Sequence, residues 1–365
     1  MKIKNNPENF YITSQSQLQG IIGLIREAKL VALDTEFTRQ TTYYPILSII
    51  QIAVKNSAGA QKTFIIDCIS DLDLNELFSV ISDPKIIKIL HSSTQDLQIF
   101  YHKSGLLPQG VIDTQIMANF CGFGFSVGYS NLVERLFQKQ LDKKQQRSDW
   151  QRRPLSKNQL EYALLDVVFL EEIYRIFLEI LLQQNRLDWL REEMENFVQK
   201  ILFRTDDNLS KNFSFRGRSS KQITQIKNLV LWREDWARKV NVPRQHFLKD
   251  EVIEKIIANE SAEKINGLTP KMLEEINQIL DEESEISDQS FKREKKFFMS
   301  ENQKNSYQEA KKIIAKISVQ ENFSEQFLIT SADIGKVICE KNFLNEKVVG
   351  WRYQLFGKEL EQLIL

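Results

Sequence analysis

The stretch Leu30–Phe37, LVALDTEF, is the most informative part of the sequence for the fold. It begins as the apolar run of a buried strand and ends with two carboxylates, Asp34 and Glu36, separated by one residue. Alternate side chains of a strand leave the same face, so we expect both acids on one side of a sheet. Burying two like charges together is costly unless a cation lies between them. Two interpretations stay open from this stretch alone: a strand ending in a solvated turn, or part of a cation site.

The residues around this strand alternate between strand and helix patterns. Short connections join the first three predicted strands, which favours antiparallel neighbours, whereas the later strands alternate with helices, which favours parallel additions. The sequence therefore predicts a mixed α/β sheet flanked by helices. The expected strands are 30–36, 47–54, 62–68, 86–91 and the start of 111–120, and the expected helices are 16–28, 74–83, 94–105, the rest of 111–120 and 129–139.

Strand patterns disappear after about residue 200. Two helical segments follow, separated by DEESEISDQS (281–290), which has five acids and no basic residue and is typical of a linker. The segments WARKVNVPRQHFLKDEVIEKI and AKISVQENFSEQFLITSADIGKVI share a basic helix, a Phe-Leu pair and an Ile-rich helix. This weak repeat predicts two related small helical domains.

Length and charge are those of a globular protein with more than one domain. The chain has 365 residues, with 49 basic and 49 acidic side chains. Locally the balance differs, because residues 201–250 carry 11 basic and 5 acidic side chains. This excess fits either a nucleic-acid-binding surface or a solvated helical face.

Cysteine usage and the N-terminal sequence predict a cytoplasmic protein. The three cysteines are scattered, so they form neither a disulfide framework nor a Cys-x-x-Cys metal site. The N-terminal MKIKNNPENF has no apolar signal region, and no apolar run is long enough to span a bilayer. We therefore expect no membrane partner.

Two further segments supply polar groups that could join Asp34 and Glu36. Asp96 lies in ILHSSTQDLQIF at a strand-to-helix junction, and Tyr162 and Asp166 lie four residues apart in QLEYALLDVVFL. Each has an ordinary explanation, helix capping for Asp96 and core packing plus a surface acid for the pair. Four carboxylates in one pocket would need hard cations such as Mg²⁺ or Mn²⁺. Two such ions ~3.5–4 Å apart would suit phosphodiester displacement.

These segments resemble a known family. ALDTEFTRQTTYYPILSIIQIA, ILHSSTQDLQIF and SDWQRRPLSKNQLEYALLDVVFL look like the three exonuclease motifs of ribonuclease D, in the DEDDy group of 3′-to-5′ exonucleases. The DEDDh group has His five residues before its last Asp, where this chain has Glu161. LVLWREDWARKVNVPRQHFLKDEVIEKIIA resembles the helical HRDC domain, and VVGWRYQLFGKELEQLI resembles the end of a second, diverged HRDC domain.

The resemblance implies the architecture. It implies a ribonuclease H-like α/β DEDD exonuclease domain over residues 1–205, followed by all-α HRDC-type domains at 206–285 and 291–365.

It also implies a role for each site residue. Asp34, Glu36 and Asp166 would bind one divalent metal ion, and Asp34 and Asp96 would hold a second, Asp96 through water. Tyr162 would hold the attacking water. A phenol with an ordinary pKa of ~10 is a poor base at neutral pH, which favours orientation over proton abstraction.

Contacts to the substrate are implied less directly. Thr35 and Phe37 would touch the 3′-terminal nucleotide through backbone and stacking, although Phe37 could equally belong to the core. His91 is expected to be a packing histidine. In KNFSFRGRSSKQ (211–222), cations alternate with Phe213 and Phe215, a pattern that fits RNA binding or merely a linker. Its cations are Lys211, Arg216, Arg218 and Lys221.

The predicted function is a metal-dependent 3′-to-5′ exoribonuclease that trims structured RNA such as tRNA precursors, without a small-molecule cofactor. Two alternatives remain: a DNA 3′-to-5′ exonuclease with the same site, and a non-catalytic RNA-binding protein. Intact acids and Tyr162 argue against the second. Recognition of the 2′-hydroxyl, which would exclude the first, leaves no mark in the sequence.

Overall fold

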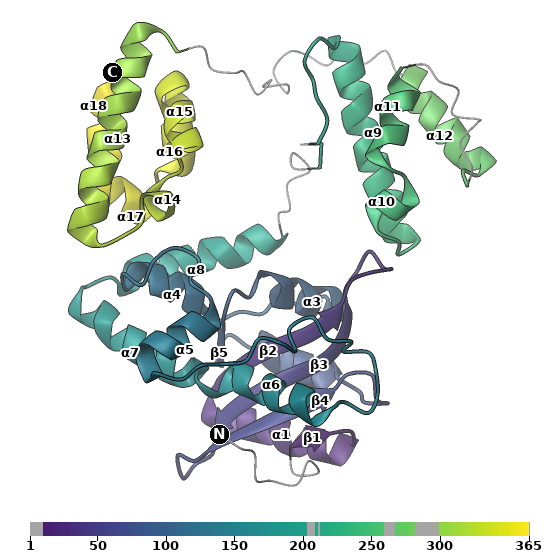
Figure 1. Cartoon of the computed structure of the whole chain (residues 1–365), viewed down its shortest axis with the longest axis vertical. Coiled ribbons are helices and arrows are strands. Elements are labelled where there is room, and N and C mark those ends of the chain that lie inside the picture. The colour runs from purple at the N-terminus through teal and green to yellow at the C-terminus, as the bar shows by residue number, and fades with distance from the viewer. Residues whose placement is uncertain (1–9, 203–208, 211, 259–266, 282–298, 365) are drawn as a thin grey trace. The chain divides into compact units, whose positions relative to one another are not determined.

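The computed structural model describes residues 10–202, 209–210, 212–258, 267–281 and 299–364 (Figure 1). Contacts divide the chain into two compact units. Unit 1 comprises residues 1–37, 47–202 and 294–365, and unit 2 comprises 38–46 and 203–293. The predicted linker at 281–290 lies, apart from Asp281, outside the described residues. None of the helices described is long and apolar enough to cross a membrane.

A mixed six-stranded sheet with the order β1-β4-β3-β2-β5-β6 forms the centre of unit 1. Strands β3 and β4 are antiparallel, whereas β1 with β4, β2 with β5 and β5 with β6 are parallel. This confirms the predicted mixed sheet. The strands are β1 (Tyr11–Ile12), β2 (Leu30–Thr38), β3 (Ile46–Lys55), β4 (Gln61–Asp67), β5 (Ile87–Leu90) and β6 (Val111–Asp113).

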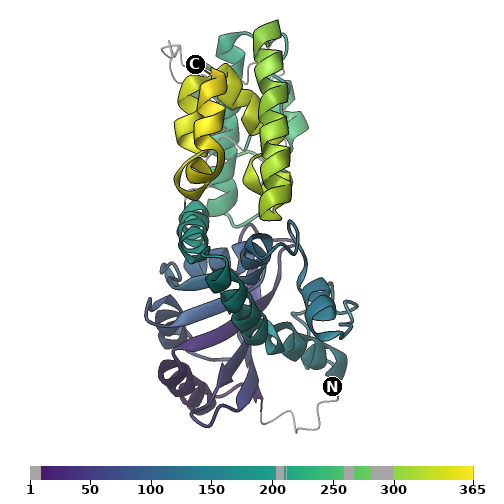
Figure 2. The same ribbon diagram turned by 90° about the vertical axis from the view of Figure 1, so that its left-hand side faces the viewer.

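Helices cover both faces of the sheet (Figures 1 and 2). On β2, Val31 and Leu33 join a core with α1, α2 and α3, whereas Ala32 packs with Val167 and Leu170 near the α6–α7 junction. Asp34 and Glu36 continue the alternation on the Ala32 side. The helices of this region are α1 (Gln15–Ala28), α2 (Asn75–Ser82), α3 (Thr94–Ser104), α4 (Thr114–Phe120), α5 (Tyr129–Phe137), α6 (Lys157–Val168), α7 (Leu170–Gln183) and α8 (Leu187–Leu202).

The last helical segment belongs to the same unit as the sheet. Trp351 is fully buried and stacks on Trp189 of α8, with ring centroids 5.6 Å apart. The Arg352 guanidinium donates to Glu193 of α8 at 2.6 Å, and Phe120 of α4 also packs against Trp351. The segment contains α13 (Glu301–Glu321), α14 (Glu325–Leu328), α15 (Ser331–Cys339), α16 (Lys341–Lys347), α17 (Gly350–Arg352), a π-helical turn (Tyr353–Gly357) and α18 (Lys358–Ile364).

Unit 2 is a helical body that also includes the loop after β2. Its buried Glu234 accepts a hydrogen bond from the Tyr43 hydroxyl and pairs with Arg244 at 3.1 Å. Arg238 donates to the same Tyr43 hydroxyl at 3.0 Å. The helices of unit 2 are α9 (Ser220–Lys239), α10 (Arg244–Phe247), α11 (Asp250–Ile257) and α12 (Pro270–Asp281).

Candidate active site

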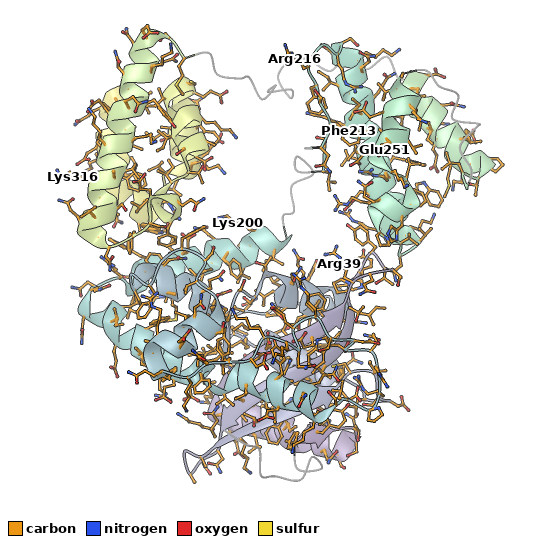
Figure 3. All side chains as sticks on the ribbon, in the orientation of Figure 1. Arg39, Lys200, Phe213, Arg216, Glu251 and Lys316 are labelled. Carbon is orange, nitrogen blue, oxygen red and sulfur yellow. The ribbon has the colours of Figure 1, made fainter. Side chains whose placement is uncertain are left out.

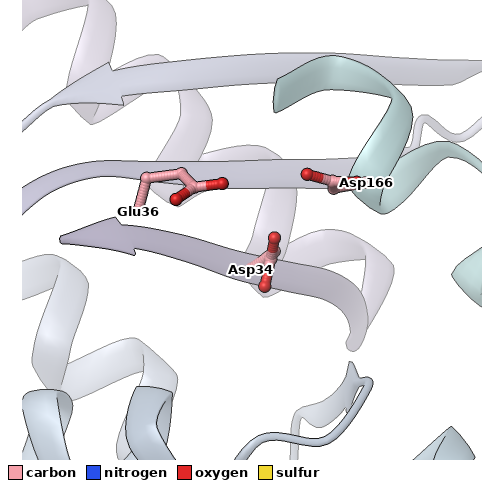
Figure 4. A group of neighbouring side chains, drawn as sticks. All are labelled: Asp34, Glu36 and Asp166. Atoms are coloured by element: carbon pink, nitrogen blue, oxygen red, sulfur yellow. The ribbon is translucent and has the colours of Figure 1, made fainter. Parts of the chain in front are cut away.

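Three carboxylates converge above the sheet. Asp34 and Glu36 leave one face of β2, as the strand period predicts, and Asp166 reaches them from α6 (Figure 4). One carboxylate oxygen from each lies within 4.8 Å of the others. Side chains from a strand and a helix far apart in sequence therefore form one oxygen-donor cluster.

Asp96 approaches the same strand from the first turn of α3, and its side chain is buried. Its carboxylate accepts a hydrogen bond from the Thr35 hydroxyl. Thr35 lies between Asp34 and Glu36 in sequence, so its side chain leaves the opposite face of β2. Asp96 thus stands beside the cluster of Asp34, Glu36 and Asp166 and is not one of its three closely spaced members.

Asp113 stabilises the turn between β5 and α3, the helix that carries Asp96. Sequence reasoning missed this role of Asp113. Its carboxylate accepts from the backbone N–H groups of Ser92 at 3.0 Å and Ser93 at 2.8 Å, and from the Ser93 hydroxyl at 2.9 Å. It also caps α4 by accepting from the Gln115 N–H at 2.8 Å. Ser92 has a φ of 57°, so this carboxylate stabilises a left-handed turn. The only signal in the sequence is an aspartate at the end of a predicted strand.

Tyr162 lies one helical turn before Asp166 on α6. The Trp150 ring packs on it with centroids 6.0 Å apart, and Trp150 itself is 2% exposed. Ser156 begins α6 with a capping box, in which its hydroxyl accepts from the Gln159 N–H and the Gln159 side chain accepts from the Ser156 N–H. Helix α6 is thereby fixed at the end nearer the phenol.

The cluster is electrostatically unfavourable without cations. Burial, followed by the charges of Asp96, Asp166 and Glu36, raises the pKa of Asp34 well above its usual value. Burial and the charges of Asp166 and Asp96 raise the pKa of Glu36 to about 9. Burial also raises the pKa of Asp166 to about 7, although a hydrogen bond with Tyr162 lowers it in part. Burial raises the pKa of Asp96 to about 6, although a hydrogen bond from Thr35 lowers it in part.

Burial and the neighbouring carboxylates affect the phenol in the same direction. Desolvation, then the charges of Asp166, Glu36 and Asp34, raise the pKa of Tyr162 above its ordinary value. The hydroxyl therefore keeps its proton at neutral pH. A protonated phenol can orient a group by hydrogen bonding, and this role of Tyr162 stays a prediction.

An arginine missed by sequence reasoning fixes the segment before α6. The Arg153 guanidinium binds both carboxylate oxygens of Asp67 on β4, at 2.7 and 2.6 Å. It also donates to the carbonyl oxygens of Trp150 at 2.8 Å and Ser48 at 3.1 Å. Burial would raise the pKa of Asp67, but hydrogen bonds from Arg153, from the Tyr11 hydroxyl and from the Ile69 N–H, together with the Arg153 charge, keep it below its usual value. These contacts of Arg153, called the Arg153 clamp below, attach the segment before α6, and with it the helix that carries Tyr162, to strands β3 and β4.

The structure places two of the candidate substrate residues on β2. The side chain of Thr35 is 5% exposed and engaged with Asp96, and Phe37 packs against the core on the face opposite the acids. His91 shares a hydrogen bond with the Thr114 hydroxyl at 2.9 Å and packs against the ring of Tyr129. These surroundings agree with the packing role expected for His91.

The remaining candidates lie in unit 2 (Figure 3). Arg216 is exposed, whereas Arg218 forms an ion pair with Glu254 and donates to the Ser214 carbonyl at 2.8 Å. Phe213 is 6% exposed and belongs to the core of unit 2, so it does not offer a free stacking surface. Lys211 lies outside the described residues.

Comparison with known proteins places the chain in a family. A family model described as 3′-5′ exonuclease matches residues 9–182. Ribonuclease D of Bartonella henselae is 30% identical, with 97% of this chain and 89% of the relative covered. Ribonuclease D of Zymomonas mobilis is 31% identical, with 97% and 93% covered. The crystal structure of Escherichia coli RNase D shares the fold, with a TM-score of 0.77, 24% identity and 98% of both chains covered. The chain therefore belongs to the ribonuclease D family of 3′-to-5′ exoribonucleases.

Proposed function

We propose that this exoribonuclease removes nucleotides from RNA 3′ ends by two-metal hydrolysis at Asp34, Glu36, Asp96 and Asp166. The observation that carries the proposal is the half-buried cluster of Asp34, Glu36 and Asp166, in which one carboxylate oxygen of each residue lies within 4.8 Å of the others. Clustered carboxylates whose pKa values are raised, by burial and for Asp34 and Glu36 also by the neighbouring charges, are the ligand set that hard divalent cations neutralise.

The residues fit two Mg²⁺ or Mn²⁺ ions by donor chemistry. All the ligands are carboxylate oxygens, and Asp166 Oδ2 is buried without a hydrogen-bond partner among the described residues. Asp34, Glu36 and Asp166 would hold one ion, and Asp34 and Asp96 the other. When bound, the ions supply electrostatic stabilisation of the attacking and leaving oxygens.

The protein side chains do the positioning. The protonated Tyr162 hydroxyl accepts a hydrogen bond from the attacking water. This hydrogen bond directs a lone pair of the water oxygen towards the phosphorus. Thr35 keeps Asp96 oriented through its hydroxyl, while its backbone remains the candidate contact to the terminal nucleotide. The ring of Phe37 packs on the core, so only its exposed outer edge can contact the terminal nucleotide.

The substrate class is structured RNA with a free 3′ end, tRNA precursors first among them. Support comes from the E. coli relative, described as an exoribonuclease involved in structured RNA processing. We infer that residues 206–285 and 291–365 are HRDC-type domains. We also infer that Arg216 and the neighbouring Arg218, both in the first of these domains, contact the RNA. A cytoplasmic location remains the prediction of the cysteine pattern.

The test uses one RNA labelled at its 5′ end or at its 3′ end, and DNA of the same sequence, with Mg²⁺ or with EDTA. We expect the 3′ label to appear at once as a mononucleotide and the 5′-labelled product to shorten stepwise, only with Mg²⁺. Asp34→Asn should lower the rate by several orders of magnitude, because it removes the ligand shared by both ions. Mg²⁺-dependent turnover by pure Asp34→Asn protein would refute the two-metal assignment, and equal rates on DNA would refute RNA selectivity.

A further inference from the structure

The long segment between α5 and α6 is the most basic part of the catalytic unit. Residues 138–156 contain no helix or strand, although loops beyond about 12–15 residues are uncommon and often functional. From Lys139 to Lys157 there are seven basic and two acidic side chains, although residues 1–200 as a whole are nearly balanced. The seven are Lys139, Lys143, Lys144, Arg147, Arg152, Arg153 and Lys157.

Four of these cations are exposed and uncompensated. Lys143, Arg147, Arg152 and Lys157 have no ion-pair partner within the described parts of the chain. The two acids of the segment are already engaged, since Asp142 pairs with Lys144 and accepts its N–H, and Asp149 accepts the Gln151 N–H at 3.0 Å. We call Lys143, Arg147, Arg152 and Lys157 the basic track.

The segment that carries the track is held firmly beside the site helix. Gln159 of α6 donates to the Asp149 carbonyl at 3.1 Å, and Gln151 donates to the Ser48 hydroxyl. The Arg153 clamp and the burial of Trp150 against Tyr162 fix the same stretch. A rigid backbone lowers the entropic cost of presenting charged side chains to a ligand.

The track ends at the catalytic helix itself. Lys157 is the first residue of α6, five residues before Tyr162 and therefore about 7.5 Å from it along the helix axis. The phosphates of an RNA strand whose 3′ end occupies the site are the ligands that exposed, unpaired cations bind through counterion release.

Some cations of unit 2 are paired and others are not. Arg218, Arg233, Arg238 and Arg244 all form ion pairs with acids of unit 2. Arg216, Lys221 and Lys249 are exposed and have no ion pair among the described residues, so unit 2 also offers cations to RNA. What distinguishes the track is its place on the segment that leads directly into α6.

We propose that Lys143, Arg147, Arg152 and Lys157 form the phosphate-binding track that holds the single-stranded 3′ segment of the RNA next to the catalytic site. This inference rests on the proposed exoribonuclease function and names the surface that carries its substrate. The contacts are to the backbone, so the track contributes affinity and register without sequence preference.

The test measures RNA binding by fluorescence anisotropy, with a labelled 12-nucleotide RNA in EDTA over a range of salt concentrations. Neutralising the four residues (Lys143→Gln, Arg147→Gln, Arg152→Gln and Lys157→Gln together) should reduce the log–log salt slope by about 2–3, at ~0.7 per phosphate contact on a single strand. Exchanging Lys for Arg and Arg for Lys at the same four positions should retain the wild-type slope.

A matched control neutralises four exposed cations elsewhere in unit 1, at Lys85, Lys103, Lys316 and Lys358. Its salt slope should stay near that of the wild type. An unchanged slope in the track variant, or an equal loss in the control, would overturn the proposal.

Hydrolysis of a dinucleotide with Mg²⁺ separates this inference from the proposed function. A dinucleotide is too short to reach along the track, so the track variant should cleave it at the wild-type rate. Absence of Mg²⁺-dependent shortening of the end-labelled RNA by the wild type would refute the proposed function, and the anisotropy result would still test the track. Loss of dinucleotide cleavage in the track variant alone would place these residues in the catalytic site and overturn the track.

Discussion

Asp34 has three other carboxylates near it, and the pH dependence of stability follows from that arrangement. Glu36, Asp166 and Asp96 have pKa values raised to about 9, 7 and 6, so the metal-free folded state binds protons more tightly than the unfolded chain. Stability from these groups is fully present below their ordinary values near 4 and is lost as pH rises through 6 to 9.

We therefore expect the melting temperature in EDTA to fall between pH 5 and pH 9. Asp34→Asn removes one of the four charges and should flatten this fall, with each kcal/mol worth about 2–4 °C. Differential scanning calorimetry of the two proteins across this range, with and without Mg²⁺, is the measurement. The same pH dependence in both proteins would mean that the four acids do not repel one another.

Tyr162 tests whether orientation of water matters. Tyr162→Phe keeps the packing on Trp150 and deletes the hydroxyl, so we expect a loss of roughly 10²-fold in the single-turnover rate with little change in RNA affinity. Tyr101→Phe, at a 41% exposed tyrosine of α3, is the matched control. Weaker RNA binding with an undiminished single-turnover rate would instead make Tyr162 a substrate-binding residue.

At the scale of elements, the turn between β5 and α3 depends on Asp113. Asp113→Asn replaces one acceptor oxygen with an amide that faces N–H and O–H donors, so we expect a loss of about 1–3 kcal/mol in the free energy of unfolding. Urea unfolding measures it. The control is Asp73→Asn, an exposed aspartate whose carboxylate accepts only the Asn75 N–H in the hydrogen bonds described. Equal effects of both changes would show that the turn does not need the Asp113 carboxylate.

The elements that carry the acids could be predicted because they are periodic and long. The strand expected at 30–36 is Leu30–Thr38, and the helix expected at 94–105 is Thr94–Ser104. The two-residue β1 was missed, because two residues hold no period. Asp113 and Arg153 escaped notice for another reason. Their roles depend on partners brought close only by the sheet, and sequence spacing carries no such information.

At the scale of the whole molecule, charge totals proved a poor guide to the surface. In the basic region 201–250, Arg218, Arg233 and Arg238 form ion pairs within unit 2, whereas Arg216, Lys221 and Lys249 are exposed without one among the described residues. Residues 1–200 are balanced in total, yet the four cations of the basic track are exposed and unpaired among the described residues. A count along the sequence cannot separate a paired cation from a free one. Only the folded structure shows which charges remain for a polyanion.

The last helical segment is joined to the catalytic sheet by a shared apolar core. Trp351 packs on Trp189 and Phe120, and Phe120 shares this core with Phe177 of α7. Helix α7 in turn lies against the sheet through Leu170, four residues after Asp166. The sequence predicted a separate domain at 291–365. The packing predicts that unfolding of this segment and of the exonuclease fold is coupled.

Trp351→Ala tests that coupling. Truncating a fully buried tryptophan should cost about 3–5 kcal/mol, because it removes apolar contact and leaves a cavity between α8 and α17. Val319→Ala, at an 84% exposed valine of α13, should change stability by less than about 0.5 kcal/mol. Thermal unfolding followed by circular dichroism should shift downwards for Trp351→Ala, and residual dinucleotide hydrolysis after heating should fall over the same temperatures, because the helices behind the site lose their packing. If the C-terminal helices melted early while hydrolysis kept the wild-type thermal profile, the two parts would have independent cores, and the catalytic fold would owe no stability to Trp351.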